Sequence, residues 1–277
     1  MPELPEVETI RSQLVKQLPF KINLVTVTTG FKKNILKTVI PKNLCNLEIS
    51  DIQRHGKMMF FIFTNGQQML THLGMTGTWL FGFEKDIQKK ISSHTHFIIH
   101  GSHKSKKMIL AYDDPRRFGK IYFYNQEQAL NKISQFSIDL LDPNFTVPYL
   151  KNQLGKFPNR MLKVTLLDQK LFAGSGNYIA SEICARAGIR PTRLCKDIKE
   201  IEVSKIHQAI KKVILPAVKL GGTTFQGGYR DSSGNKGLGI SHLIVFYQKK
   251  CQNCKTTEVK KIILATRGTY YCEKCQK

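Results

Sequence analysis

The sequence predicts an α+β protein of two domains, and three observations lead to this prediction. Residues 20–125 contain short runs rich in β-branched and aromatic residues, separated by Gly, Asn, Ser or Lys clusters, which is typical of strands. Beyond about residue 135 the apolar residues change to longer helical periods. Four cysteines near the C-terminus form two close pairs on either side of two further β-type runs. A chain of 277 residues is long enough for two hydrophobic cores.

A helix is predicted at the start of the chain, in MPELPEVETIRSQL. Pro2 presets the backbone for a first helical turn, and the carboxylates of Glu3 and Glu6 complement the positive end of a helix dipole. Val7 and Ile10 begin an apolar face with helical spacing. Taken by itself, this segment needs no explanation beyond helix initiation.

The second domain is predicted to be helical. A helix with Asn177 as its N-cap and Gly188 as its stop has signals at both ends. By contrast, the glycines and serines of residues 221–241 predict a mobile loop rather than packed structure. The helices are expected at about 147–155, 159–168, 177–187 and 203–219.

The domain boundaries follow from where the pattern changes. Pro143 and Pro148 indicate a linker close to the change from strands to helices. We therefore expect a first domain over residues 1–135, a second over 136–240 and a cysteine hairpin over 241–277.

The chain is strongly basic. It has 43 Lys and Arg residues against 20 Asp and Glu residues, a formal net charge of +23. Such an excess attracts a polyanion, and counterion release makes nucleic acid the expected partner. A membrane surface is the alternative, but the sequence has neither a basic amphipathic helix nor a lipidation motif. Without a signal peptide or a membrane span, the protein is expected in the cytoplasm or nucleoid.

The four paired cysteines predict a zinc site. Their C-x2-C-x17-C-x2-C spacing is typical of a tetrahedral four-thiolate site, here clasping a hairpin with Arg267 near its tip. Because all four ligands are protein thiolates, no position is open for a catalytic water, so one structural Zn²⁺ is expected. A redox pair or accidental spacing is the alternative. The ligands are Cys251, Cys254, Cys272 and Cys275.

Five motifs together resemble one family. MPELPEVET is followed in order by HLGM at 72–75, DPRRFG at 114–119, LLDQKLFAGSGN at 166–177 and the cysteine hairpin. In this order, and over nearly the whole length, the chain resembles bacterial formamidopyrimidine-DNA glycosylases. The resemblance implies an N-terminal β-sandwich with a helix, then a helix-two-turn-helix domain with a zinc finger, and damaged double-stranded DNA in a basic cleft.

The resemblance also implies a covalent mechanism at the N-terminus. If Met1 is removed, Pro2 presents a secondary amine, which the family uses to attack C1′ of the damaged nucleotide. A secondary amine forms an obligate iminium cation, which acidifies the C2′ proton and permits β- and then δ-elimination. By family position Glu3 is the acid that protonates the sugar oxygen, Glu6 orients it, and Lys57 contacts phosphate; alone, Lys57 is an ordinary strand lysine. Arg267 matches the zinc-finger arginine of δ-elimination.

Further residues are implied as DNA contacts. The family fills the space left by an everted nucleotide with a methionine, an arginine and a phenylalanine, which are Met75, Arg116 and Phe118 here. Contacts to the DNA backbone fall on His94, Lys163 and Asn177. Residues 225–240 resemble the loop that closes over an everted 8-oxoguanine.

Four departures from the family pattern stand out. Tyr178-Ile179 replaces an expected Ile-Tyr, which leaves the packing of that helix start open. VFYQKK precedes Cys251 in place of the usual Tyr-Gly-Arg and Pro-Cys elements, and the span between cysteine pairs is one residue longer. An insertion at 104–107 lengthens a surface hairpin.

The expected function is that of a monomeric, bifunctional DNA glycosylase and abasic-site lyase acting on oxidised purines, without a small-molecule cofactor. One alternative is the sister endonuclease VIII type, which acts on oxidised pyrimidines. A second is a non-catalytic zinc-finger protein that binds DNA. A third, an RNA-binding zinc-ribbon protein, leaves the N-terminal motif unexplained.

Overall fold

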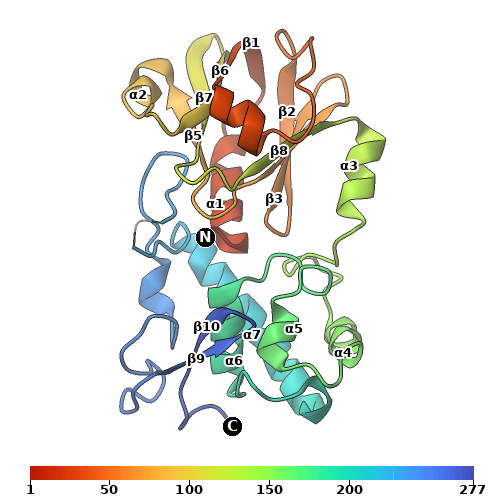
Figure 1. Cartoon of the computed structure of the whole chain (residues 1–277), viewed down its shortest axis with the longest axis vertical. Helices are drawn as coiled ribbons and strands as arrows, with labels where there is room; N and C mark the ends of the chain where they lie inside the picture. The colour runs from red at the N-terminus through yellow and green to blue at the C-terminus, as the bar shows by residue number, and fades with distance from the viewer. Residues whose placement is uncertain (227) are drawn as a thin grey trace. The chain divides into compact units, whose positions relative to one another are not determined.

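The computed structural model describes residues 1–226 and 228–277. Contacts divide the chain into two compact units, one of Met1–Ser134 with Leu220–Leu238 and one of Gln135–Lys219 with Gly239–Lys277. Figure 1 shows the elements of both units. The segment 220–238, which the sequence groups with the helical domain, folds with the first unit.

The first unit contains eight antiparallel strands in the order β5-β7-β6-β1-β2-β3-β4-β8. The helices described in this unit are α1 (Leu4–Val15), α2 (Glu84–Gln88), α3 (Gln126–Ile133) and the π-helix η1 (Phe31–Ile35). The strands are β1 (Phe20–Val27), β2 (Glu48–His55), β3 (Met58–Phe63), β4 (Gln68–His72), β5 (Thr78–Phe83), β6 (Thr95–His103), β7 (Lys106–Asp113) and β8 (Lys120–Tyr124).

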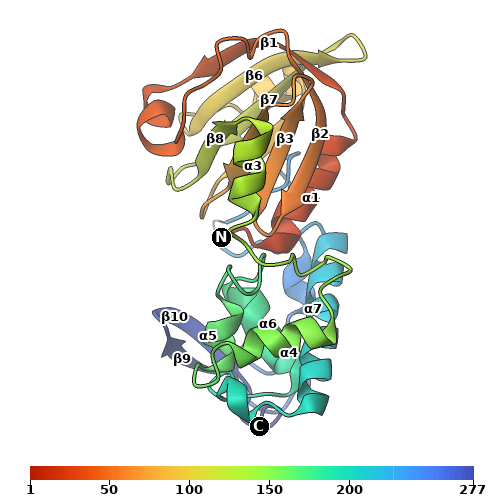
Figure 2. The same ribbon diagram turned by 90° about the vertical axis from the view of Figure 1, so that its right-hand side faces the viewer.

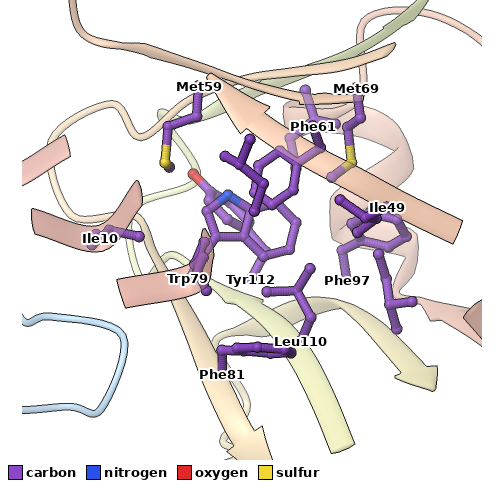
Figure 3. Close-up of a cluster of buried hydrophobic side chains, with 14 of the residues drawn as sticks. Ile10, Ile49, Met59, Phe61, Met69, Trp79, Phe81, Phe97, Leu110 and Tyr112 are labelled. Carbon is purple, nitrogen blue, oxygen red and sulfur yellow. The ribbon is translucent and has the colours of Figure 1, made fainter. Parts of the chain in front are cut away.

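Aromatic contacts show that this sheet folds over into a sandwich. Trp79 on β5 and Phe61 on β3 are far apart in strand order, yet their ring centroids lie 5.1 Å apart. Tyr112 and Phe97 contact the same indole at 5.1 and 6.0 Å. Figure 3 shows these rings in the shared core. Burial of each such ring contributes roughly 1.5–3 kcal/mol, so the core holds both layers together.

Helix α1 supplies the predicted apolar face to this core. Val7, Ile10 and Leu14 are buried in the same cluster as the aromatic rings. The helix contacts β2 and β3, beside which it lies in Figure 2. The sandwich therefore fixes the direction in which the start of α1 projects.

The second unit is helical, as predicted. Helix α6 has Gly176 as its N-cap, one residue before the expected Asn177, and it ends at Gly188 with φ +72°, as expected. The helices are α4 (Val147–Gly155), α5 (Leu162–Leu166), α6 (Asn177–Ala187) and α7 (Glu200–Lys219), and the hairpin strands are β9 (Lys260–Leu264) and β10 (Arg267–Tyr271). Pro148 lies in the first turn of α4 rather than in a linker. Along the described residues, no helix is long and apolar enough to cross a membrane.

The segment 220–238 is packed in its described residues, although the sequence predicts a mobile loop. Ser232 donates its backbone N–H to the Gln13 side chain of α1 at 3.0 Å and accepts from the backbone of Phe81 at 2.9 Å. Gln13 also donates to Asp231 at 2.9 Å. Composition cannot reveal these partners, because Phe81 and Gln13 lie 151 and 219 positions away from Ser232 along the chain. Within this segment Gly227 lies outside the described residues.

Candidate functional site

Two buried carboxylates surround the start of α1. Pro2 is buried directly before Glu3, the N-cap, and Glu3 and Glu6 are only 2% and 1% exposed. Their side chains form a reciprocal capping box, in which the Glu3 backbone N–H donates to Glu6 Oε2 at 2.8 Å. The cap satisfies backbone donors that the first helical turn leaves unpaired. The Glu6 carboxylate is thereby held against the peptide group that joins Pro2 to Glu3.

The other oxygen of Glu6 binds the 220–238 segment. The backbone N–H of Thr223 donates to Glu6 Oε1 at 2.7 Å. A Cβ added at Gly222 would lie 3.1 Å from Glu6 Cγ and 2.7 Å from the Tyr229 ring, so only glycine fits this approach. Sequence reasoning missed Thr223, because nothing in its local pattern indicates contact with the first helix.

Lys57 lies in the turn between β2 and β3. Gly56, with φ +57°, makes the turn, and Lys57 is half-buried. Burial, together with the nearby charges of Lys57 and Lys120, lowers the pKa of His72 to about 4. His72 is therefore neutral at pH 7, and its Nδ1 accepts a hydrogen bond from the Gly74 N–H at 3.1 Å.

The HLGM and DPRRFG loops lie against each other. A Cβ at Gly74 would come within 2.5 Å of the Phe118 carbonyl carbon, so the two backbones are in direct contact. Asp114, fully buried, accepts from the Thr76 hydroxyl at 2.6 Å and from the Gly119 N–H at 2.8 Å. Its own backbone N–H donates to the carbonyl of the exposed His94 at 2.9 Å. Both loops are thus fixed by one carboxylate that the sequence reasoning did not single out.

The expected void-filling side chains project from this loop pair. Phe118 is 51% exposed, and the Arg116 guanidinium lies 4.6 Å from the centre of its ring. Met75 is half-buried in the adjacent turn. The structure therefore places three residues from two motifs about forty positions apart on one pair of loops, with Arg116 and Phe118 exposed to solvent.

A buried lysine organises the second unit. Lys163 has no exposed surface, and its ammonium donates to Asn177 Oδ1 at 2.6 Å and to the Thr269 hydroxyl at 2.8 Å. Asn177 in turn donates to the Gly268 carbonyl at 3.0 Å. The lysine expected to contact DNA therefore lies behind Asn177 and ties the start of α6 to the cysteine hairpin. The sequence around Lys163 does not indicate its burial, because its partners Asn177 and Thr269 are distant along the chain.

The hairpin presents Arg267 to solvent. Ala265 and Thr266 both have positive φ, 46° and 62°, and turn the chain between β9 and β10. Arg267 follows directly as the first residue of β10 and is exposed. Figure 2 shows the hairpin beside α5 and α6.

Glu182 of α6 holds the altered segment before Cys251. This carboxylate is fully buried and accepts from the backbone N–H groups of Ile244, Val245 and Phe246 at 2.7–2.8 Å. Burial raises the pKa of Glu182, although these three donors and Arg186 oppose that shift. The unusual VFYQKK sequence is docked through these backbone groups and through the buried Phe246 ring, which packs against Tyr178 and Tyr270.

The four cysteine sulfurs form a cluster that suits a metal ion. They lie within 4.8 Å of one another, and two of the pairs, Cys251–Cys275 and Cys254–Cys272, are both 3.9 Å apart. A tetrahedral ion with metal–sulfur bonds of about 2.3 Å separates its sulfurs by about 3.8 Å. Burial raises the pKa of Cys251 to about 12, so a bound cation is needed to keep this thiol ionised at neutral pH.

Comparisons with known proteins agree with this geometry. The family model of the formamidopyrimidine-DNA glycosylase N-terminal domain matches residues 1–121, and that of the formamidopyrimidine-DNA glycosylase H2TH domain matches residues 136–227. Formamidopyrimidine-DNA glycosylase of Listeria monocytogenes is 34% identical over 284 residues, covering 100% of both chains.

Two solved structures are similar over their whole length. MutM in complex with DNA containing carbocyclic 8-oxo-G has a TM-score of 0.87 at 28% identity. The Lactococcus lactis Fpg (MutM) complex with DNA containing an oxidised pyrimidine has a TM-score of 0.87 at 27% identity. Both cover 100% of this chain and of the compared chain.

Proposed function

Because the chain belongs to the formamidopyrimidine-DNA glycosylase family, we propose that it excises oxidised purines from duplex DNA and then cleaves the abasic site. The family membership makes it a bifunctional glycosylase and lyase. The observation that carries the substrate proposal is the loop pair that bears the half-buried Met75 and the exposed Arg116 and Phe118, in the same unit as the buried Pro2–Glu6 helix start.

The nucleophile is the amine of Pro2 after removal of Met1. Attack on C1′ breaks the glycosidic bond, releases the damaged base with its bonding electrons and leaves the sugar bound to nitrogen. Because the amine is secondary, opening of the sugar ring gives an iminium cation. The cation acidifies the C2′ proton. Loss of this proton expels the 3′ phosphate, and a second elimination expels the 5′ phosphate.

Glu3 and Glu6 have distinct proposed roles. Glu3 delivers a proton to the sugar oxygen as the ring opens, for which a buried position at the helix start is suitable. Glu6 does not need to touch the sugar, because its two oxygens are bound to the Glu3 and Thr223 backbones. Glu6 therefore fixes the position of the nucleophile, Pro2, relative to the acid, Glu3.

The cationic residues act on the phosphates. Lys57, in the turn between β2 and β3, contacts a DNA phosphate. Arg267 on the hairpin binds a phosphate and assists δ-elimination, while Asn177 and His94 contact the DNA backbone with Lys163 supporting Asn177.

A single Zn²⁺ is the proposed ion of the cysteine cluster. The four thiolates fill its coordination sphere, so the ion has no free position for a substrate or a reactive water. It supplies folding energy to the hairpin that carries Arg267.

Excision of oxidised pyrimidines is the second candidate, because a similar solved structure contains an oxidised pyrimidine in DNA. The test is single-turnover excision from duplexes carrying 8-oxoguanine, a formamidopyrimidine or an oxidised pyrimidine opposite the same partner strand. Faster excision of both purine lesions supports the proposal. Faster excision of the pyrimidine would replace it with the second candidate, and tight binding without excision would leave only a DNA-binding protein.

A further inference from the structure

Arg54 connects the first helix to the turn that carries Lys57. It lies near the end of β2, and its side chain is only 8% exposed. Its Nε donates to Glu8 Oε2 of α1 at 2.8 Å, and its Nη1 donates to the Gly56 carbonyl at 3.1 Å. One planar guanidinium therefore binds two separate elements.

The carbonyl that Arg54 binds belongs to the peptide group shared by Gly56 and Lys57. Because a peptide group is planar, fixing this carbonyl also fixes the N–H and the Cα direction of Lys57. Gly56 alone cannot do this, since a glycine at φ +57° is free to adopt many other conformations.

Glu8 is the anchor on the helix side. Burial alone raises the pKa of Glu8, but hydrogen bonds from Arg11 and Arg54 outweigh it and keep the pKa below its ordinary value. Glu8 is therefore a carboxylate at neutral pH, and its bond to Arg54 is charge-assisted. It lies on the same short helix whose N-cap is Glu3.

We propose that Arg54 is a positioning residue for the reaction, which aligns the Lys57 turn with the helix that bears Pro2. This inference rests on the proposed role of Lys57. Arg54 acts on the reaction through the Gly56–Lys57 peptide group, and its effect on the rate depends on the Lys57 side chain.

Arg11 is a matched control. It binds the same Glu8 carboxylate, at 2.6 Å through Nη2, and is likewise an arginine partly buried against the sandwich. Among the described residues, its hydrogen bonds go to the Glu8 carboxylate and to the backbone carbonyl of Ile52 on β2. Replacing Arg11 removes one partner of Glu8 but leaves the bonds of Arg54 to Glu8 and to the Gly56 carbonyl, which we call the Arg54 clamp.

The experiment is a double-mutant cycle in the full-length protein. Single-turnover excision of 8-oxoguanine is measured for Arg54→Gln and Arg11→Gln, each with Lys57 retained and with Lys57→Met. Arg54→Gln is expected to slow excision roughly 10- to 100-fold when Lys57 is present, and less than about twofold in the Lys57→Met background. Arg11→Gln is expected to change the rate by less than about threefold in both.

Two further measurements separate positioning from folding. Arg54→Lys keeps the charge opposite Glu8 but cannot bind Glu8 and Gly56 with one planar fork, so it should restore thermal stability without restoring the rate. Hydrogen exchange of residues 55–58, read by mass spectrometry, should accelerate in Arg54→Gln and not in Arg11→Gln.

Equal losses for Arg54→Gln with and without Lys57, or unchanged exchange of the turn, would overturn the inference. The exchange experiment requires no activity. A third outcome is that the wild type excises no lesion while hydrogen exchange of residues 55–58 still accelerates in Arg54→Gln. In that case the proposed function is wrong, but Arg54 still holds the turn.

Discussion

His72 shows at the residue scale how burial sets the chemistry of the Lys57 turn. In an exposed position it would be a histidine that gains charge as the pH falls below its ordinary pKa of about 6.5. In this fold, burial and the charges of Lys57 and Lys120 lower that pKa to about 4, so the imidazole stays a neutral acceptor for Gly74. The fold thus avoids a further positive charge beside Lys57 and Lys120.

The lowered pKa predicts a pH-dependent stability. The unfolded state binds a proton at His72 below pH about 6.5, whereas the native state does so only near pH 4. This residue therefore stabilises the fold fully above pH about 6.5, and the contribution is lost as the pH falls towards 4. Replacing it with glutamine should reduce the loss of unfolding free energy between pH 7 and 5 by about 2 kcal/mol.

Urea denaturation at the two pH values checks this expectation. The exposed His94→Gln variant is the control, and other titrating groups cancel in the comparison with wild type. An identical pH dependence in wild type and His72→Gln would contradict the account of His72.

At the element scale, the contact between the HLGM and DPRRFG loops depends on Gly74, which has no room for a side chain. Gly74→Ala places a Cβ 2.5 Å from the Phe118 backbone at φ +65°, whereas Gly66→Ala has φ +81° but meets nothing within 4 Å. Both variants suffer conformational strain of about 1 kcal/mol, and only Gly74→Ala must also separate the loops. We expect Gly74→Ala to lose at least about 1 kcal/mol more stability than Gly66→Ala, measured by urea denaturation.

The same comparison has a functional readout. Separation of the loops moves Phe118 and Arg116 relative to Met75, so excision of 8-oxoguanine should slow in Gly74→Ala and not in Gly66→Ala. Equal stability and equal rates in the two variants would show that the loop contact is unimportant.

The hairpin is the element whose stability depends on the metal. Cys254→Ser should reduce the zinc content from about one ion per chain and weaken DNA cleavage, because three thiolates hold the hairpin less firmly. Cys45→Ser, a half-buried cysteine outside the cluster, should retain the full zinc content. Elemental analysis of the purified variants checks both. Full zinc content in Cys254→Ser would exclude this residue as a ligand.

Local sequence signals predict the elements well and their partners poorly. The α1 face, the start and stop of α6 to within one residue, and the spacing of the four cysteines are encoded by neighbours in sequence. The contact of Gln13 with residue 232, and that of Lys163 with Thr269, join positions over a hundred residues apart, so no local pattern contains them. For the same reason the packing of the described residues of 220–238 and the burial of Lys163 are apparent only in the fold.

At the scale of the whole molecule, the charge of +23 sets how the protein binds DNA. Binding should weaken linearly in log salt concentration, with a slope of about −0.9 for each phosphate neutralised. Arg267 is exposed, so Arg267→Gln should reduce the slope by about one, and Arg267→Lys should preserve it. Fluorescence anisotropy with labelled duplex over a range of salt concentrations measures both. An unchanged slope in Arg267→Gln would remove this residue from the DNA contacts.

Pro2 is the nucleophile on which every later step of the proposed reaction depends. The decisive measurement is borohydride trapping on a duplex containing 8-oxoguanine opposite cytosine, with wild type, Pro2→Gly and a form that retains Met1. We predict a covalent complex for wild type that maps to Pro2 by peptide mass, and none for the form that retains Met1. Pro2→Gly, a primary amine, should trap more weakly. A wild-type protein with a free Pro2 that binds this DNA tightly but yields no trapped complex would contradict the covalent mechanism.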